Sequence, residues 1–175
     1  LMVRSLSSFL ISRGIGHGDK VAILLPNSLE FITSFFSVAS LGAVSLPLNV
    51  AYKAEEIRFY VSDSRVKLLI TEERLKSIAE KVTDGLGISI IVVRGDKKGW
   101  SYLDSNKHPY IKVLIQPSDD ALYLYSTGST GRPKRVARTH YNITSLADNH
   151  TETVGLTEND RVLFTVPLAH TYGFG

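Results

Sequence analysis

The 175-residue sequence contains no cysteine. Disulfide bridges, thiolate nucleophiles and zinc sites with cysteine ligands are therefore excluded. A chain without thiols is compatible with a reducing compartment, and we expect a cytoplasmic protein. No other residues have the spacing of a metal site or of a Ser/His/Asp triad on a nucleophile elbow, so we predict no metal held by protein ligands alone.

Long apolar runs are absent as well. No uninterrupted apolar segment approaches the ~20 residues that a membrane-spanning helix needs. Residues 1–6 lack the apolar stretch and the small-residue cleavage site of a signal peptide. We therefore expect neither a transmembrane segment nor a secretory leader.

An excess of one charge is also missing. The net charge is +3, and the basic residues are scattered apart from one local group, Arg132, Lys134, Arg135 and Arg138. A nucleic-acid surface needs a larger basic patch or stripe, so we do not expect nucleic acid as a partner. The local group fits a small polyanion better than a duplex.

The chain does contain enough apolar material for one domain, with 43% hydrophobic and 21% charged residues. Apolar runs of strand length alternate with segments of helical periodicity. This alternation predicts an α/β fold, with a mostly parallel sheet and flanking helices. The predicted strands are 21–25, 43–46, 66–70, 88–93, 121–125, 135–138 and 162–166, with a short extra strand at 111–115.

Local signals predict where several of these elements begin and end. Asn27, with Glu30 three residues later in capping-box position, is predicted to cap the second helix. Thr71 is predicted to cap a later helix whose first turn carries two glutamates. Pro26 and Pro47 are predicted to end the strands that precede them.

Residues 125–134 follow a predicted strand and read Tyr-Ser-Thr-Gly-Ser-Thr-Gly-Arg-Pro-Lys. Backbone N–H groups beside glycines, hydroxyl donors and one mobile cation can wrap a polyphosphate. The spacing of Gly128, Gly131 and Lys134 differs from that of a Walker A loop and of the dinucleotide fingerprint. By composition alone, a surface turn rich in Ser, Thr and Gly is an equal alternative.

The full string, however, resembles the phosphate-binding signature of the acyl-adenylate-forming (AMP-binding) superfamily. This superfamily includes acyl-CoA synthetases, 4-coumarate–CoA ligases, luciferases and peptide-synthetase adenylation domains. Arg135 stands where the signature usually has a glycine. Further stretches that resemble the family in the expected order are 18–22, 26–28, 42–49, 139–142, 160–163 and 167–173.

The resemblance implies that residues 1–175 form a partial N-terminal AMP-binding domain. The rest of that large domain and the small C-terminal lid domain lie outside these residues. A small-molecule carboxylate, ATP with Mg²⁺, and CoA are the implied substrates and cofactors. The positions implied to bind the ATP phosphates are Ser126, Thr127, Gly128, Ser129, Thr130, Gly131 and Lys134.

Two further residues receive roles from the same resemblance. A lone histidine among apolar residues is more often structural, but His170 matches the family's Pro-x-x-His segment. That match implies a catalytic, substrate-binding ring beside the carboxylate and the α-phosphate. Tyr172 would line the acyl pocket, with simple core packing as the alternative.

The implied activity is that of an ATP-dependent carboxylate–CoA ligase. The carboxylate would become an acyl-AMP with release of pyrophosphate, and a thioester would then form. Two alternatives stay open: an adenylation domain that charges a carrier-protein thiol, and a non-catalytic truncated remnant. Since later family elements lie outside residues 1–175, we expect this segment to be inactive by itself.

Overall fold

The computed structural model describes residues 2–93, 112–126, 133–163 and 165–170. Helices and strands alternate through most of this part of the chain. In chain order the elements are α1 (Met2–Ser12), β1 (Lys20–Leu24), α2 (Leu29–Ala39), β2 (Val44–Leu48), α3 (Ala54–Asp63), β3 (Leu68–Glu72), the short 3-10 helix η1 (Glu73–Leu75), α4 (Lys76–Thr83), β4 (Ser89–Val93), β5 (Asp120–Ser126), β6 (Lys134–Thr139) and α5 (His140–Val154).

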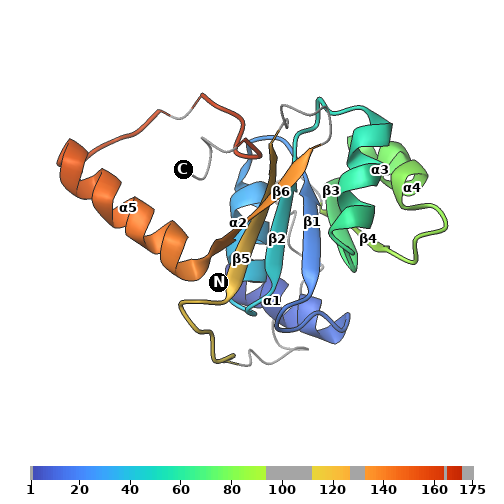
Figure 1. Ribbon diagram of the computed structural model, residues 1–175, viewed down its shortest axis with the longest axis horizontal. Helices are drawn as coiled ribbons and strands as arrows, with labels where there is room; N and C mark the ends of the chain where they lie inside the picture. Colours follow the sequence, from blue (N-terminus) through green and yellow to red (C-terminus); the bar gives the residue numbers. More distant parts are fainter. Residues whose placement is uncertain (1, 94–111, 127–132, 164, 171–175) are drawn as a thin grey trace.

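The strands form one sheet in the order β4-β3-β1-β2-β5-β6 (Figure 1). Neighbours from β4 through β5 run parallel, whereas β6 returns antiparallel to β5. The expected mostly parallel α/β sheet is thus confirmed. Because the parallel strands point the same way, their carboxyl ends meet at one edge, which is where α/β proteins usually bind ligands.

Two apolar layers hold the helices on opposite faces of this sheet. Alternate residues of β1 point to opposite sides, as the pleat requires. Val21 and Ile23 pack in a cluster with α1 and α2, whereas Ala22 and Leu24 pack in a second cluster with α3 and α4. The sheet is therefore the middle of three layers, and its central strands are buried on both faces.

Helix α2 begins one residue later than the capping prediction. Ser28, not Asn27, is the N-cap: its backbone is extended and its Oγ accepts a hydrogen bond from the Phe31 N–H at 3.2 Å. Either residue type can cap a helix, and the adjacent Asn27 side chain has distant partners instead. The sequence pattern alone could not separate two neighbouring good caps.

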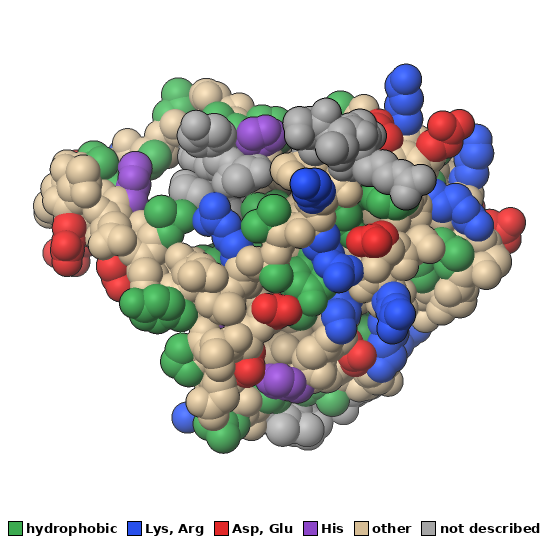
Figure 2. Space-filling model, viewed as in Figure 1, with side chains coloured by type: hydrophobic (Ala, Val, Ile, Leu, Met, Phe, Trp, Pro, Cys, Tyr) green, Lys and Arg blue, Asp and Glu red, His purple; other side chains and the backbone are tan. Residues whose placement is uncertain are grey.

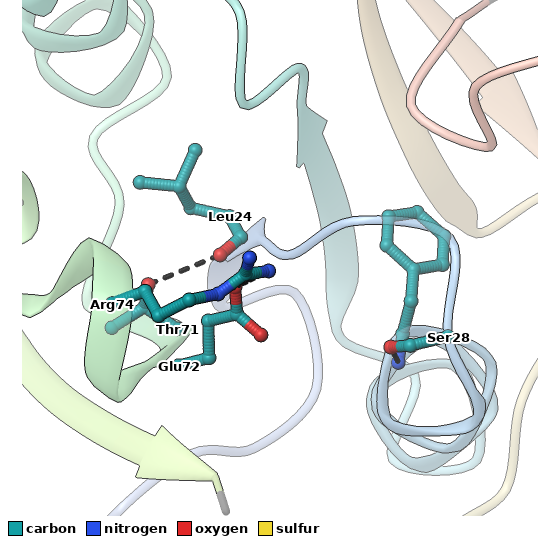
Figure 3. A network of polar contacts seen from close by, with 6 residues as sticks. Leu24, Ser28, Thr71, Glu72 and Arg74 are labelled. Atoms are coloured by element: carbon teal, nitrogen blue, oxygen red, sulfur yellow. Dashed lines mark hydrogen bonds and ion pairs between the residues drawn. The ribbon is translucent and has the colours of Figure 1, made fainter. Parts of the chain in front are cut away.

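Thr71 likewise does not cap a helix. It lies within β3, and its Oγ1 donates a hydrogen bond to the Leu24 carbonyl of β1 at 3.1 Å (Figure 3). After β3, Arg74 Nε donates to Glu72 Oε1 at 2.8 Å beside the 3-10 helix. A buried threonine hydroxyl needs a partner, and the neighbouring strand supplies one.

Pro47 does not end its strand. Strand β2 continues through Pro47 to Leu48, paired with β1 up to Leu24 opposite Leu48. Proline has no N–H to donate to a neighbouring strand. On the other side, the pairing of β2 with β5 within the described residues is confined to Ser45 opposite Leu122. The two strands thus lack ladder contacts at their carboxyl ends.

Two other predicted strands are wrong. Residues 112–116, the described part of the predicted strand 111–115, are not in a strand. The described residues of 162–166 are not in one either, and Leu163 is 88% exposed. A strand needs a neighbour to pair its backbone groups, and β6 already ends the described sheet on that side. An apolar run alone does not reveal whether that neighbour exists.

Asp119 links three separate segments just before β5. Its Oδ2 accepts hydrogen bonds from His17 Nε2 at 2.8 Å and from the Gln116 N–H at 2.7 Å. Its carbonyl accepts from the N–H of His140, the first residue of α5, at 3.0 Å. The His17 ring also packs against Gly42. A Cβ built on Gly42 would lie 2.5 Å from this ring, so position 42 requires glycine.

Helix α5 projects from the edge of the sheet (Figure 1), and none of its residues is buried. Its N-terminus is nevertheless well defined, because Thr139 accepts from the Asn142 N–H and Asn142 Oδ1 accepts from the Thr139 N–H. Within the described residues, no helix has the length and apolar character needed to cross a membrane.

We predict that Phe31→Ala lowers the free energy of unfolding by about 3–5 kcal/mol, because it leaves a cavity in the core beneath α2. Phe31 is 0% exposed. Phe36→Ala is the matched control on the same helix, and since Phe36 is 54% exposed its effect should be about 1 kcal/mol or less. Chemical denaturation measures both, and equal losses would contradict this packing.

We also expect Asp119 to make the stability of the fold depend on pH. The hydrogen bond from His17 and that from the Gln116 N–H lower the pKa of Asp119 below its ordinary 3.8. Between the two pKa values the folded chain binds fewer protons than the unfolded chain. The Asp119 contribution to stability is therefore present above about pH 4 and is lost as pH falls through the lowered pKa.

Asp119→Asn should consequently flatten the acid limb of a plot of unfolding midpoint against pH. Asp148→Asn, which removes an exposed carboxylate from α5, should leave that limb unchanged. An identical acid limb in wild type and Asp119→Asn would rule out this linkage.

Candidate functional site

A cavity of about 230 Å³ opens at the carboxyl edge of the sheet. It lies where β2 and β5 are no longer joined by ladder contacts. Residues from both strands, from α3 and from the segment after α5 line it. They are Pro47, Leu48, Tyr52, Tyr60, Leu124, Tyr125, Ser126, Ala169 and His170.

The antiparallel pairing of β5 with β6 brings Ser126 and Lys134 together beside this cavity. Ser126 ends β5 and lies opposite Lys134, the first residue of β6. The Ser126 hydroxyl donates to the Lys134 carbonyl at 3.5 Å. A hydroxyl and an exposed ammonium group thus flank the predicted phosphate loop. The other predicted phosphate-binding residues, Thr127, Gly128, Ser129, Thr130 and Gly131, lie outside the described residues.

His170 reaches the same cavity from a different part of the chain. A tight turn carries it, in which the His170 N–H donates to the Pro167 carbonyl at 2.9 Å. Ala169 is 8% exposed and packs into the core cluster, whereas His170 is exposed. The structure therefore brings two of the predicted site residues, Ser126 and His170, to one cavity. Tyr172 lies outside the described residues.

Asn27 holds the turn that carries His170. Its Nδ2 donates to the Val166 carbonyl at 2.9 Å, and its Oδ1 accepts from the Leu168 N–H at 2.7 Å. One side-chain amide thus makes the two hydrogen bonds that a neighbouring strand would make. Sequence reasoning missed this role, although the position of Asn27 three residues after the end of β1, at the carboxyl edge, was an available signal.

Tyrosines form one wall of the cavity. The rings of Tyr60 and Tyr125 lie 4.4 Å apart between centroids. Burial, and then the hydrogen bond that its hydroxyl donates to Asp63, raise the pKa of Tyr125 to about 12. Burial also raises the pKa of Tyr52 and of Tyr60. These phenols are neutral at physiological pH, so the wall offers hydroxyl groups and aromatic faces without charge.

The charges around the site are mixed. In Figure 2, Lys and Arg side chains gather over the sheet half of the face shown, with Asp and Glu among them, and few lie over α5. In the described part of the chain, no group of three His, Asp or Glu side chains could hold a metal ion.

Residues 1–175 match the profile of the family described as AMP-binding enzyme. The chain belongs to this family. The suspected superfamily resemblance is thus confirmed, and with it the assignment of the fold to the N-terminal domain of adenylate-forming enzymes. The match does not by itself assign roles to Ser126, Lys134 or His170.

Individual AMP-binding relatives are similar over nearly all of this chain. A probable CoA ligase of Humulus lupulus is 38% identical, over 95% of this chain and 33% of its own length. The oxalate–CoA ligase of Arabidopsis thaliana is 36% identical, over 99% and 35%. The structure of a long-chain-fatty-acid–CoA ligase from Archaeoglobus fulgidus superposes with a TM-score of 0.87 and 26% identity, over 99% of this chain and 35% of that one. The chain spans about a third of the length of these relatives.

We predict that Asn27→Ala exposes the Leu168 amide. Loss of one hydrogen bond of about 1 kcal/mol should raise the hydrogen-exchange rate of that amide about fivefold. Asn49→Ala is the matched control, because Asn49 Oδ1 accepts from the nearby Ala51 N–H and both asparagines line a second cavity of about 200 Å³. Unchanged Leu168 exchange in Asn27→Ala would contradict the role of this side chain.

Proposed function

We propose that the natural polypeptide carrying residues 1–175 is an ATP-dependent carboxylate–CoA ligase. Membership of the AMP-binding family supports this proposal, as do the relatives, which are named CoA ligases for oxalate, 4-coumarate and long-chain fatty acids. These names also favour CoA over a carrier-protein thiol as acceptor. They differ in the acid, so the substrate is proposed only as a small-molecule carboxylate.

One observation carries the proposal: Ser126, Lys134 and the turn of His170 meet at the carboxyl edge of the sheet. Attack of a carboxylate oxygen on the α-phosphorus of ATP brings negative charges together. The bond from that phosphorus to the β-phosphate oxygen breaks, and pyrophosphate leaves with its electrons. Hydroxyl donors and an ammonium group beside the phosphates stabilise this charge.

In this proposal Ser126 donates a hydrogen bond to a phosphate oxygen, and Lys134 neutralises the leaving pyrophosphate. Thr127, Gly128, Ser129, Thr130 and Gly131 would provide the remaining hydroxyl and backbone donors. His170, which also lines the cavity, would bind and gate the carboxylate at the α-phosphate, with Tyr172 beside the acyl group. In the second step the CoA sulfur attacks the acyl carbon, and AMP leaves.

Mg²⁺ would enter as the ATP complex. Mg²⁺ usually binds through substrate phosphates and one or two carboxylates, and the described residues contain no cluster that could hold it alone. The ion would reduce the charge of the phosphates, while Ser126 and Lys134 would orient them. We further propose that residues 1–175 need the remainder of the large domain and a small lid domain for catalysis.

We predict that Lys134→Ala in the natural polypeptide lowers carboxylate-dependent ATP–pyrophosphate exchange on the order of a hundredfold, because one preorganised charge is lost. Lys76→Ala removes an exposed ammonium group from α4 and should leave the exchange rate unchanged.

Two outcomes would contradict the proposal. Absence of exchange in the wild-type polypeptide with any carboxylate would favour the non-catalytic alternative. Exchange at the wild-type rate in Lys134→Ala would remove Lys134 from the site. Residues 1–175 alone serve as the inactive comparison, and thioester formation on a carrier protein but not on CoA would favour the other adenylating branch.

A further inference from the structure

Arg135 occupies the last position of the phosphate-binding signature, where the family usually has a glycine. It is the second residue of β6, directly after Lys134, and lies opposite Tyr125 of β5. Tyr125 in turn directly precedes Ser126. The pair Tyr125 and Arg135 therefore occupies the ladder position next to the two residues that flank the phosphate loop.

Both members of this pair contact Asp63, the last residue of α3. Arg135 Nη1 donates to the Asp63 carbonyl at 3.0 Å and lies 3.5 Å from Asp63 Oδ2. The Tyr125 hydroxyl donates to Asp63 Oδ2 and also lies 2.8 Å from Ser64 Oγ. One helix end thus holds both strands of the hairpin.

The guanidinium group has a second contact on the same side of the sheet. It lies over the ring of Tyr123, 4.9 Å from the ring centroid. A planar guanidinium can lie flat on an aromatic face while its edge donates to a neighbouring oxygen, a geometry that glycine lacks and that a lysine ammonium does not reproduce. Arg135 is therefore anchored between α3 and β5.

The position of Asp63 explains why a cation is needed there. The C-terminus of a helix carries partial negative charge, and its last carbonyls lack partners within the helix. A carboxylate at that end is unfavourable unless a donor or a positive charge lies beside it. Arg135 supplies both, because it reaches the Asp63 carbonyl as well as the carboxylate.

We propose that Asp63 and Arg135 are positioning residues for the phosphate site. Through Tyr125 and the backbone of β6, they hold Ser126 and Lys134 in the geometry that binds ATP. This inference rests on the proposed function. In it, Arg135 acts on the nucleotide through the hairpin and does not touch the phosphates.

The test uses the natural polypeptide with Arg135→Gln, Asp63→Asn and the double variant. Each single change should raise the KM for ATP about threefold to tenfold, with the KM for the carboxylate and the thermal midpoint unchanged. The double variant should be close to Arg135→Gln alone, because the ion pair that Asp63→Asn removes is already absent in Arg135→Gln. Arg135→Lys should restore part of the affinity, since an ammonium group keeps the charge but loses the fork.

Arg74→Gln is the matched control, because Arg74 also pairs with a carboxylate, that of Glu72, but away from the hairpin. It should leave the KM for ATP unchanged. A rise in KM for Arg135→Gln with none for Asp63→Asn would show that Arg135 binds phosphate directly, which would overturn the positioning role. An unchanged KM in both variants would also overturn it.

Hydrogen exchange separates a failure of this inference from a failure of the proposed function. The amides of β6 should exchange faster in both Arg135→Gln and Asp63→Asn, whether or not the protein is a ligase. If the wild type does not bind ATP but these amides exchange faster in both variants, the ligase proposal fails. The contact of Asp63 with Arg135 would still be shown to hold β6 in place. Unchanged exchange of these amides in both variants would overturn the positioning role of Asp63 and Arg135.

Discussion

The site depends on the point at which backbone pairing between β2 and β5 stops. In the described residues that pairing is Ser45 opposite Leu122, and Pro47 beyond it has no N–H to donate. The strands still belong to one sheet, because β2 stays paired with β1 as far as Leu48. Side chains of both strands line the resulting cavity, and β6 pairs with β5 up to Ser126, which also lines it.

Polar contacts between residues distant in the sequence then join the segments that surround the cavity. Asn27 joins the end of β1 to the turn of His170, across 139 and 141 positions of the chain. Asp63 joins the end of α3 to both strands of the β5–β6 hairpin. Each contact uses a polar side chain near the end of a strand or helix, where backbone groups need partners. The site is thus assembled on one sheet with two separate polar anchors, Asn27 and Asp63.

Several features could be read directly from residues. Strict alternation of apolar runs with helical periodicity predicted the parallel sheet, because burial on both faces of β1 demands a continuous apolar strand. The strand β6 followed from the same local patterns. Wrong predictions came from choices that are locally equivalent. Asn27 and Ser28 are both good caps, Thr71 suits a cap or a strand, and the run 162–166 is apolar whether or not a neighbouring strand is present.

The sequence by itself determined the family and the α/β class, because long strings of residue types and short-range periodicity are visible along the chain. Only the tertiary structure decided that Ser126 and His170 share a cavity, that Asn27 holds the His170 turn, and that Arg135 contacts Asp63. The reason is that such contacts join residues dozens of positions apart. Their partners are chosen by which strands lie side by side, and no local pattern of side chains encodes that choice.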